Sequence, residues 1–446
     1  MRAPSRAARA LGIAFAAASL AGCERDAARP PPLPERPGIL LVIGDDVGFG
    51  DYGFMGSGVA RTPNLDRLAA EGVVFTHAFD TASVCRPSLQ SLLTGLQPFD
   101  VERQLALDRR GGREPRRFAD AFETLPELLV RRGYRAFAGG KFWEGSPLDA
   151  GFTHAMTEWP PWRERGPLDS LTLAAGGYGL AIGRETLAPL EEFLAAQGRE
   201  PYFVWYAPML PHLPFDAPER HAELFRDAPL PPLARGYYAN LARFDEGVGE
   251  ILATLEREGL RERTLVIYLA DNGWDPLHDS GDPATRGLGG PQGKLSIHEL
   301  GFRTPLVVSW PGVLPQGRRD DRLVSTLDLL PTILELAGAP VPGRLPGRSL
   351  LPALLGREGQ WRDRVVGVGE GLRADGPDGG SRRTWYLRTR EWRFVSGGRD
   401  QPERLYRIQE DPTESRDLAA EHPDVVRELR LLLLEDIAAM TSPARH

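Results

Sequence analysis

Short apolar runs that alternate with amphipathic helical patterns are the feature that most restricts the fold of this chain. Five runs have the length and residue types of buried strands, and helical patterns lie between them. The strand-like runs are residues 39–43, 134–138, 202–206, 264–269 and 305–310. The helical patterns cover residues 64–71, 125–132, 185–196 and 238–258. This alternation predicts an α/β fold with a large, mostly parallel sheet that is flanked by helices on both faces.

Each strand-like run adjoins polar residues of the kinds that carry chemistry. In chain order these are Asp45 and Asp46, Lys141, His212, Asp271 and Asn272, and finally Lys294, whose loop precedes the last run. In α/β folds ligands bind beyond the carboxyl ends of the strands. We therefore expect these side chains to gather at one edge of the sheet.

The pattern changes after residue 340. Residues 338–347 are rich in Pro and Gly, short strand candidates follow at 384–387 and 393–395, and residues 423–438 form an amphipathic pattern. This predicts a first domain over residues 38–340. It also predicts a smaller C-terminal α+β subdomain, residues 341–446, with a short antiparallel sheet.

The first 22 residues have a basic start and an apolar stretch that is too short to span a bilayer, which is typical of a secretion signal. They end in Leu-Ala-Gly before Cys23, which resembles a bacterial lipoprotein signal. Residues 23–37 then read as a Pro-rich and Ala-rich tether. We expect an exported protein in the bacterial periplasm or cell envelope, bound to membrane only through a lipid on Cys23. The formal net charge of −7 argues against a nucleic-acid partner.

Lysine is almost absent from this chain. Of the 54 basic residues only Lys141 and Lys294 are lysine. The ammonium group is a compact point charge on a flexible stem, which the planar guanidinium of Arg does not replace. These two positions are therefore candidates for an anion-binding site.

Cys85 is the one cysteine left once Cys23 is assigned to lipid. It stands in the segment Cys85-Arg86-Pro87-Ser88-Leu89, and Pro87 predicts that a helix begins directly after Cys85. The start of a helix favours an anionic group or a thiolate.

With this segment the chain resembles the sulfatase family of the alkaline phosphatase superfamily, in which a Cys of the form Cys-x-Pro-Ser-Arg is oxidised to formylglycine. The likeness runs over nearly the whole chain after the tether. Further matching segments are residues 43–50, 62–68, 139–141, 211–212, 271–273, Lys294 with 299–305, 328–332, and 405–406 with 411–412.

The resemblance implies that Asp45, Asp46, Asp271 and Asn272, together with the modified Cys85, bind one divalent cation, most simply Ca²⁺. Hydrated formylglycine at Cys85 would supply a geminal diol. One hydroxyl attacks the sulfur of a sulfate ester, and the other then expels sulfate. Lys141, Lys294 and His212 would hold the sulfate and assist the leaving alcohol. The implied partners are a sulfated small molecule or glycan and a formylglycine-generating enzyme.

The chain departs from the family pattern at two positions. Leu89 stands where the family has Arg, and Trp143 stands where the family has His. Three hypotheses therefore remain open: a lipid-anchored sulfatase, a phosphate or phosphonate ester hydrolase of the same superfamily, and an inactive lipoprotein that binds sulfated ligands.

Overall fold

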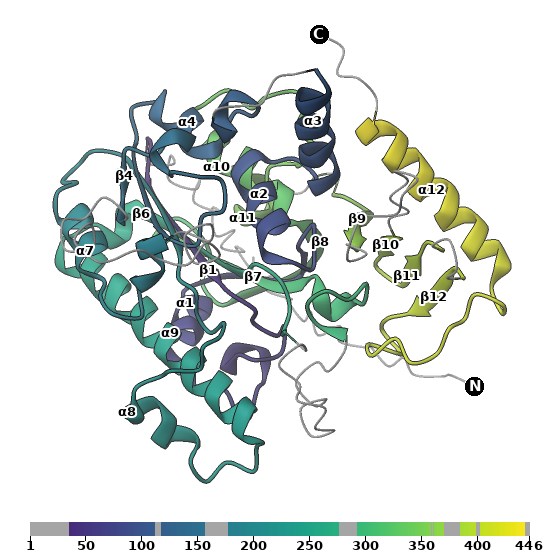
Figure 1. Cartoon of the computed structure of the whole chain (residues 1–446), viewed down its shortest axis with the longest axis horizontal. Coiled ribbons are helices and arrows are strands. Elements are labelled where there is room, and N and C mark those ends of the chain that lie inside the picture. Colours follow the sequence, from purple (N-terminus) through teal and green to yellow (C-terminus); the bar gives the residue numbers. More distant parts are fainter. Residues whose placement is uncertain are drawn as a thin grey trace, which may run out of the picture. The chain divides into compact units, whose positions relative to one another are not determined.

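The computed structural model describes residues 35–111, 117–156, 177–275, 292–357, 359, 361–369, 384–397 and 402–441 (Figure 1). The predicted signal, Cys23 and most of the tether lie outside the described residues. The strands are β1 (Gly38–Gly44), β2 (Gly72–Phe79), β3 (Arg135–Gly140), β4 (His154–Ala155), β5 (Tyr202–Ala207), β6 (Thr264–Ala270), β7 (Arg303–Ser309), β8 (Arg318–Ser325), β9 (Arg364–Gly369), β10 (Thr384–Thr389), β11 (Trp392–Val395) and β12 (Arg404–Arg407). The helices are α1 (Pro63–Ala70), α2 (Cys85–Thr94), α3 (Pro98–Arg110), α4 (Leu125–Val130), α7 (Ala188–Ala195), α8 (Glu219–Ala222), α9 (Pro232–Arg257), α10 (Leu329–Leu336), α11 (Leu351–Leu354) and α12 (Pro423–Thr441).

The large sheet has eight strands in the order β4-β3-β5-β1-β6-β7-β2-β8. Neighbouring strands are parallel except where β7 pairs with β6 and with β2. All five predicted strand runs are present, and the predicted α/β class is confirmed. Because β7 runs opposite to the others, its start lies at the edge where the parallel strands end. This direction brings the loop that carries Lys294 to the predicted edge of the sheet.

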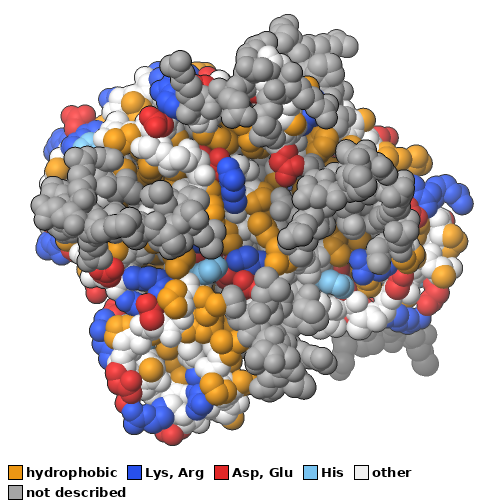
Figure 2. Space-filling view, viewed as in Figure 1, with side chains coloured by type: hydrophobic (Ala, Val, Ile, Leu, Met, Phe, Trp, Pro, Cys, Tyr) orange, Lys and Arg blue, Asp and Glu red, His pale blue; other side chains and the backbone are white. Residues whose placement is uncertain are grey.

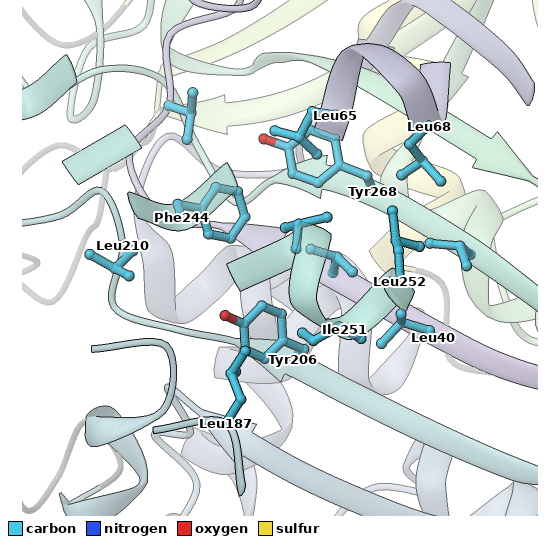
Figure 3. Close-up of a cluster of buried hydrophobic side chains, with 14 of the residues drawn as sticks. Leu40, Leu65, Leu68, Leu187, Tyr206, Leu210, Phe244, Ile251, Leu252 and Tyr268 are labelled. Atoms are coloured by element: carbon cyan, nitrogen blue, oxygen red, sulfur yellow. The ribbon is translucent and has the colours of Figure 1, made fainter. Parts of the chain in front are cut away.

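The core lies between the sheet and its helices. On one face α1 and α7 pack against the long helix α9, and on the other face α2, α4 and α10 contact one another. Figure 3 shows part of the first layer, where Leu40 of β1 and Tyr268 of β6 lie with Ile251 and Leu252 of α9. Leu65 of α1 belongs to the same buried cluster. Burial of apolar side chains on both faces explains why the central strands read as continuous apolar runs.

The C-terminal strands form a second, antiparallel sheet in the order β12-β11-β10-β9. One face packs against α12 through residues such as Leu387, Phe394 and Leu429. The other face joins side chains of the first sheet, including Phe79 and Leu323. This confirms the small antiparallel sheet, whereas the domain boundary after residue 340 stays a prediction. Residues 34–446 group into one compact unit.

Two fully buried ion pairs lie between this second sheet and its surroundings, and the segment that follows Lys294 contacts one of them directly and the other through Glu414. Arg388 Nε lies 2.7 Å from Glu299 Oε2, and Arg393 Nε lies 2.7 Å from Glu414 Oε1. Glu414 also accepts a hydrogen bond from the backbone N–H of Glu299 at 2.7 Å. A buried ion pair is costly to break on one side, because the remaining charge is left without a partner. The second sheet therefore braces the Lys294 loop.

Basic and acidic side chains are interspersed on the face that Figure 2 draws. Among the described residues, no helix is both long enough and apolar enough to cross a membrane.

Candidate active site

Asp45, Asp46 and Asp271 come together because β1 and β6 end at the same level. Gly44 pairs with Ala270 at the last step of the parallel ladder, and the Asp271 backbone N–H donates to the Gly44 carbonyl at 2.9 Å. Asp46 has a φ of 64°, which Asp tolerates better than most residues. Its backbone N–H donates to Asp271 Oδ1 at 3.1 Å. The three buried carboxylates therefore share one small space at the predicted edge.

Cys85 is the first residue of α2 and is buried beside these carboxylates. The helix begins at Cys85 itself, one residue earlier than the sequence pattern predicts. Its Sγ lies 3.6 Å from Asp45 Oδ1 and 3.7 Å from Asp46 Oδ1. Burial and then the charge of Asp271 raise the pKa of the thiol above its ordinary value. An unmodified Cys85 is therefore held as a neutral thiol in this environment.

The two lysines pair with different carboxylates of the site, Lys141 with Asp45 and Lys294 with Asp46. Lys141 Nζ is 2.6 Å from Asp45 Oδ2 and 3.5 Å from Cys85 Sγ, and Lys294 Nζ is 2.8 Å from Asp46 Oδ2. Burial opposes their charges, but the nearby carboxylates raise the pKa of both lysines above the ordinary value. Both ammonium groups are therefore charged at neutral pH.

Backbone contacts fix the segments that carry the lysines. The Lys141 N–H donates to the Ala207 carbonyl at 2.7 Å, and the Lys294 N–H donates to the Trp274 carbonyl at 2.7 Å. Gly140 has a φ of 102°, and a Cβ there would lie 1.9 Å from the Ala207 carbonyl oxygen. Only glycine fits directly before Lys141 in this conformation.

His212 reaches the site from the loop after β5. Its Nδ1 lies 2.8 Å from the Leu213 carbonyl oxygen, which can only accept, so Nδ1 carries the hydrogen. Its Nε2 faces the site and lies 3.6 Å from Asp46 Oδ2. The ring can therefore donate from Nε2 only when it is protonated.

The donor set fits a hard divalent cation. Asp45, Asp46, Cys85 and Asp271 offer ligand atoms within 4.8 Å of one another. Asn272 donates from Nδ2 to Asp46 Oδ1 at 2.6 Å, while its buried Oδ1 accepts no hydrogen bond from any described residue. A carbonyl oxygen left without a donor beside crowded carboxylates suits an oxygen-coordinated cation.

The charges point the same way. Burial first, and the charge of Asp45 next, raise the pKa of Asp271 to about 8, although Lys141 opposes the shift. The charges of the two lysines therefore do not fully balance the charges of the three carboxylates Asp45, Asp46 and Asp271. A cation in this space would offset the deficit.

Asp275 is a site residue that the sequence analysis missed. Its buried carboxylate lies 3.5 Å from Lys294 Nζ, and it falls within 4.8 Å of ligand atoms of Asp46 and His212. The signal that could have revealed it is its position four residues after Asp271, in the same strand-end segment. Asp275 supplies Lys294 with a second carboxylate besides Asp46.

The two positions that depart from the family pattern, Leu89 and Trp143, carry uncharged side chains. Leu89 is buried in α2. Trp143 follows Lys141 closely, and its buried Nε1 has no hydrogen-bond acceptor among the described residues. Neither side chain brings a charge to Cys85.

Comparisons with known proteins agree with this geometry. Residues 37–339 match the family described as Sulfatase, and residues 291–439 match the one described as N-sulphoglucosamine sulphohydrolase, C-terminal. N-acetylgalactosamine-6-sulfatase of Canis lupus familiaris is 33% identical in an alignment of 372 positions, which covers 75% of this chain and 68% of that protein. Arylsulfatase A of Homo sapiens is 32% identical in an alignment of 359 positions, which covers 72% of this chain and 68% of that protein.

Among solved structures, the crystal structure of Ps i-CgsB has a TM-score of 0.74 and 25% identity, and the match covers 92% of this chain and 94% of that one. The family match spans well over half of the chain, and the relatives carry the names of enzymes that cleave sulfate esters. Of the three hypotheses, these findings favour a sulfatase over the other two. The chain belongs to the sulfatase family and is a sulfuric ester hydrolase.

Proposed function

We propose that this protein cleaves the sulfate ester of a sulfated sugar, with Cys85 matured to formylglycine as its nucleophile. One observation carries the proposal. Cys85 Sγ lies within 3.7 Å of both Asp45 and Asp46 and 3.5 Å from Lys141 Nζ, so nucleophile, candidate metal ligands and cation meet at one point. The hydrated aldehyde supplies two hydroxyl groups on one carbon, one to attack the sulfur and one to expel sulfate and restore the aldehyde.

The cation in this proposal is Ca²⁺, held by Asp45, Asp46, Asp271 and Asn272. All four side chains offer hard oxygens, and Ca²⁺ accepts six to eight oxygen ligands in flexible geometry. The buried Asn272 Oδ1 supports its place in the set. When bound, the ion supplies positive charge that lowers the pKa of a hydroxyl at position 85.

Lys141, Lys294 and His212 hold the sulfate group in this proposal. The ammonium groups pair with Asp45 and Asp46, and they would be free to donate to sulfate oxygens once these carboxylates hold the cation. The leaving alcohol departs as an alkoxide that needs a proton. His212 Nε2 and Lys294 Nζ are the groups on the Asp46 side that can donate it.

The proposed substrate class is a sulfated glycan or a smaller sugar sulfate. The name N-acetylgalactosamine-6-sulfatase among relatives at 33% identity supports a sugar alcohol as the leaving group. We expect the loops at residues 159–179 and 274–290 to contact the alcohol, and most of their residues lie outside the described part of the chain.

The decisive experiment is mass spectrometry of the peptide that contains Cys85, from protein made in its native host, together with measurement of sulfate released from N-acetylgalactosamine 6-sulfate. We expect an aldehyde at position 85 and catalytic sulfate release. A free thiol in every molecule of an active preparation would exclude the formylglycine mechanism. An aldehyde without release from any sulfated sugar would exclude the substrate class.

Lys294→Arg is expected to lower kcat/KM by about 10²- to 10³-fold. A guanidinium is planar and wider than an ammonium, so it cannot take the position between Asp46, Asp275 and the sulfate. Steady-state kinetics on one sugar sulfate measures the effect. Arg67→Lys is the control, because Arg67 pairs with Glu256 on the exposed surface. Wild-type kinetics in Lys294→Arg would remove Lys294 from the site.

We also propose export to the cell envelope and anchoring through a lipid on Cys23, after maturation of Cys85 by a formylglycine-generating enzyme. The residue pattern of the first 23 residues supports this part of the proposal. Cys23→Ala is expected to move the mature protein from the membrane fraction to the soluble fraction. Continued partition into membranes would contradict lipid attachment.

A further inference from the structure

A second contact joins the segment of Cys85 to the segment of Lys141. Glu144 lies three residues after Lys141, and its side chain is 7% exposed. Arg86 reaches it with two parallel bonds, from Nε to Oε1 at 2.9 Å and from Nη2 to Oε2 at 3.0 Å. Gln90 Nε2 donates to the same Oε1 at 2.9 Å. We refer to Arg86, Gln90 and Glu144 as the clamp.

The clamp sits where it controls the spacing of reacting groups. Arg86 directly follows Cys85, and Gln90 lies one helical turn later on the same face of α2. A two-point bond between guanidinium and carboxylate fixes orientation as well as distance. The clamp thereby holds the first turn of α2 against the loop in which Lys141 Nζ lies 3.5 Å from Cys85 Sγ.

In the sequence, the clamp residues adjoin the two positions that depart from the family pattern. Leu89 lies between Arg86 and Gln90 in α2, and Trp143 directly precedes Glu144. Neither carries a charge. The clamp provides a charged link between these same two segments.

From these contacts we propose that Glu144 is a positioning residue for the sulfatase reaction, acting through Arg86 and Gln90 to hold position 85 against Lys141. This inference rests on the proposed function, because it assigns Cys85 and Lys141 their roles in the reaction. Half of the Arg86 side chain is exposed, at 52%, and ion pairs of this kind contribute little to stability. A small displacement of a nucleophile, in contrast, can lower a rate strongly.

The test uses Glu144→Gln, which keeps the shape of the side chain and removes its charge. We expect kcat per formylglycine to fall by about 10- to 100-fold while KM stays within about twofold, because the clamp does not touch substrate. Amide hydrogen exchange should become faster in peptides that cover α2 and residues 141–147. The melting temperature should stay close to that of the wild type.

Glu403→Gln is the matched control. Glu403 accepts a similar fork from Arg430, with Nε to Oε1 at 2.7 Å, and the pair joins the start of β12 to α12, which carry none of the site residues. The control should leave unchanged both kcat and the amide hydrogen exchange of α2 and residues 141–147. The charge-swapped protein, Arg86→Glu with Glu144→Arg, should recover at least part of the lost kcat.

The outcomes separate the clamp from the proposed function. If amide hydrogen exchange in α2 and residues 141–147 is unchanged in Glu144→Gln, the positioning role of the clamp is wrong whatever the activity. It is also wrong if kcat is unchanged, or if the variant differs from the wild type only in KM. If the charge-swapped protein folds but recovers none of the lost kcat, the pairing of Arg86 with Glu144 is not the cause of the loss in Glu144→Gln. A wild-type protein that carries formylglycine and releases no sulfate contradicts the proposed function instead, and the exchange measurement still decides whether the clamp holds α2.

Discussion

Cys85→Ser is expected to abolish turnover, with a loss in kcat on the order of 10⁴-fold or more. Serine has a single hydroxyl in place of the Cys85 thiol, whose Sγ lies 3.6 Å from Asp45 Oδ1 and 3.7 Å from Asp46 Oδ1. The serine oxygen can lose its proton and attack the sulfur, and the alcohol can leave with a proton from His212 or Lys294. The sulfate then stays bound to the serine oxygen, because no second hydroxyl on the same carbon can expel it.

The measurement is the intact mass of the variant after incubation with a sugar sulfate. We expect a gain of one SO₃ group on the peptide with position 85, and at most one alcohol released per protein. Cys23→Ser serves as the control, since it changes the other cysteine of the chain and leaves the site intact. Multiple turnovers by Cys85→Ser would show that the second hydroxyl is dispensable and would contradict the proposed mechanism.

The strands that the sequence predicted are those buried on both faces. β1, β5 and β6 are wholly buried and read as unbroken apolar runs. β8 has no strand signal in the sequence, because this edge strand contains Arg318, Arg319, Asp320 and Asp321 and is only partly buried. β2 was not predicted either, because the half-buried Thr76 and His77 interrupt its apolar run. The residue types of β7 do not indicate that it runs antiparallel to its neighbours, because this direction depends on its pairing with β6 and β2.

The candidate site followed from the sequence wherever a polar residue directly adjoins a strand. Asp45 after β1 and Asp271 after β6 could be expected to meet, since parallel strands end at the same edge. Asp275 follows Asp271 by four residues in the same segment, and this position makes it a candidate. Its pairing with Lys294 depends on how that segment folds, which the spacing alone does not give. The contact between Arg86 and Glu144 was equally hidden, because the two residues are 58 positions apart. Arg86 is the variable position of the Cys-x-Pro-Ser segment, and Glu144 belongs to none of the matching segments. Contacts between side chains from different loops depend on tertiary packing, which cannot be read from the neighbouring residues in the sequence.

Removal of the cation is the second large effect that we expect. Chelation should lower kcat/KM by at least about 10³-fold, because a bound cation supplies several kcal/mol of charge stabilisation and about 1.4 kcal/mol corresponds to each factor of ten. Added Ca²⁺ should restore activity to the chelated and dialysed protein. Asp271→Asn should show a similar loss that Ca²⁺ does not restore. Full activity after exhaustive chelation would contradict a catalytic role for the ion.

The same ion should change how stability depends on pH. Without it, the pKa of Asp271 is raised from 3.8 to about 8 by burial and by Asp45, so the folded protein keeps a proton that the unfolded chain has released between these pH values. The free energy of unfolding of the cation-free protein should therefore fall as pH rises through this window. Ca²⁺ binds the ionised carboxylate, and it should raise the melting temperature more at pH 8 than at pH 5. Asp271→Asn, which cannot ionise, should remove most of this difference, and an equal Ca²⁺ effect at both pH values in the wild type would place the ion elsewhere.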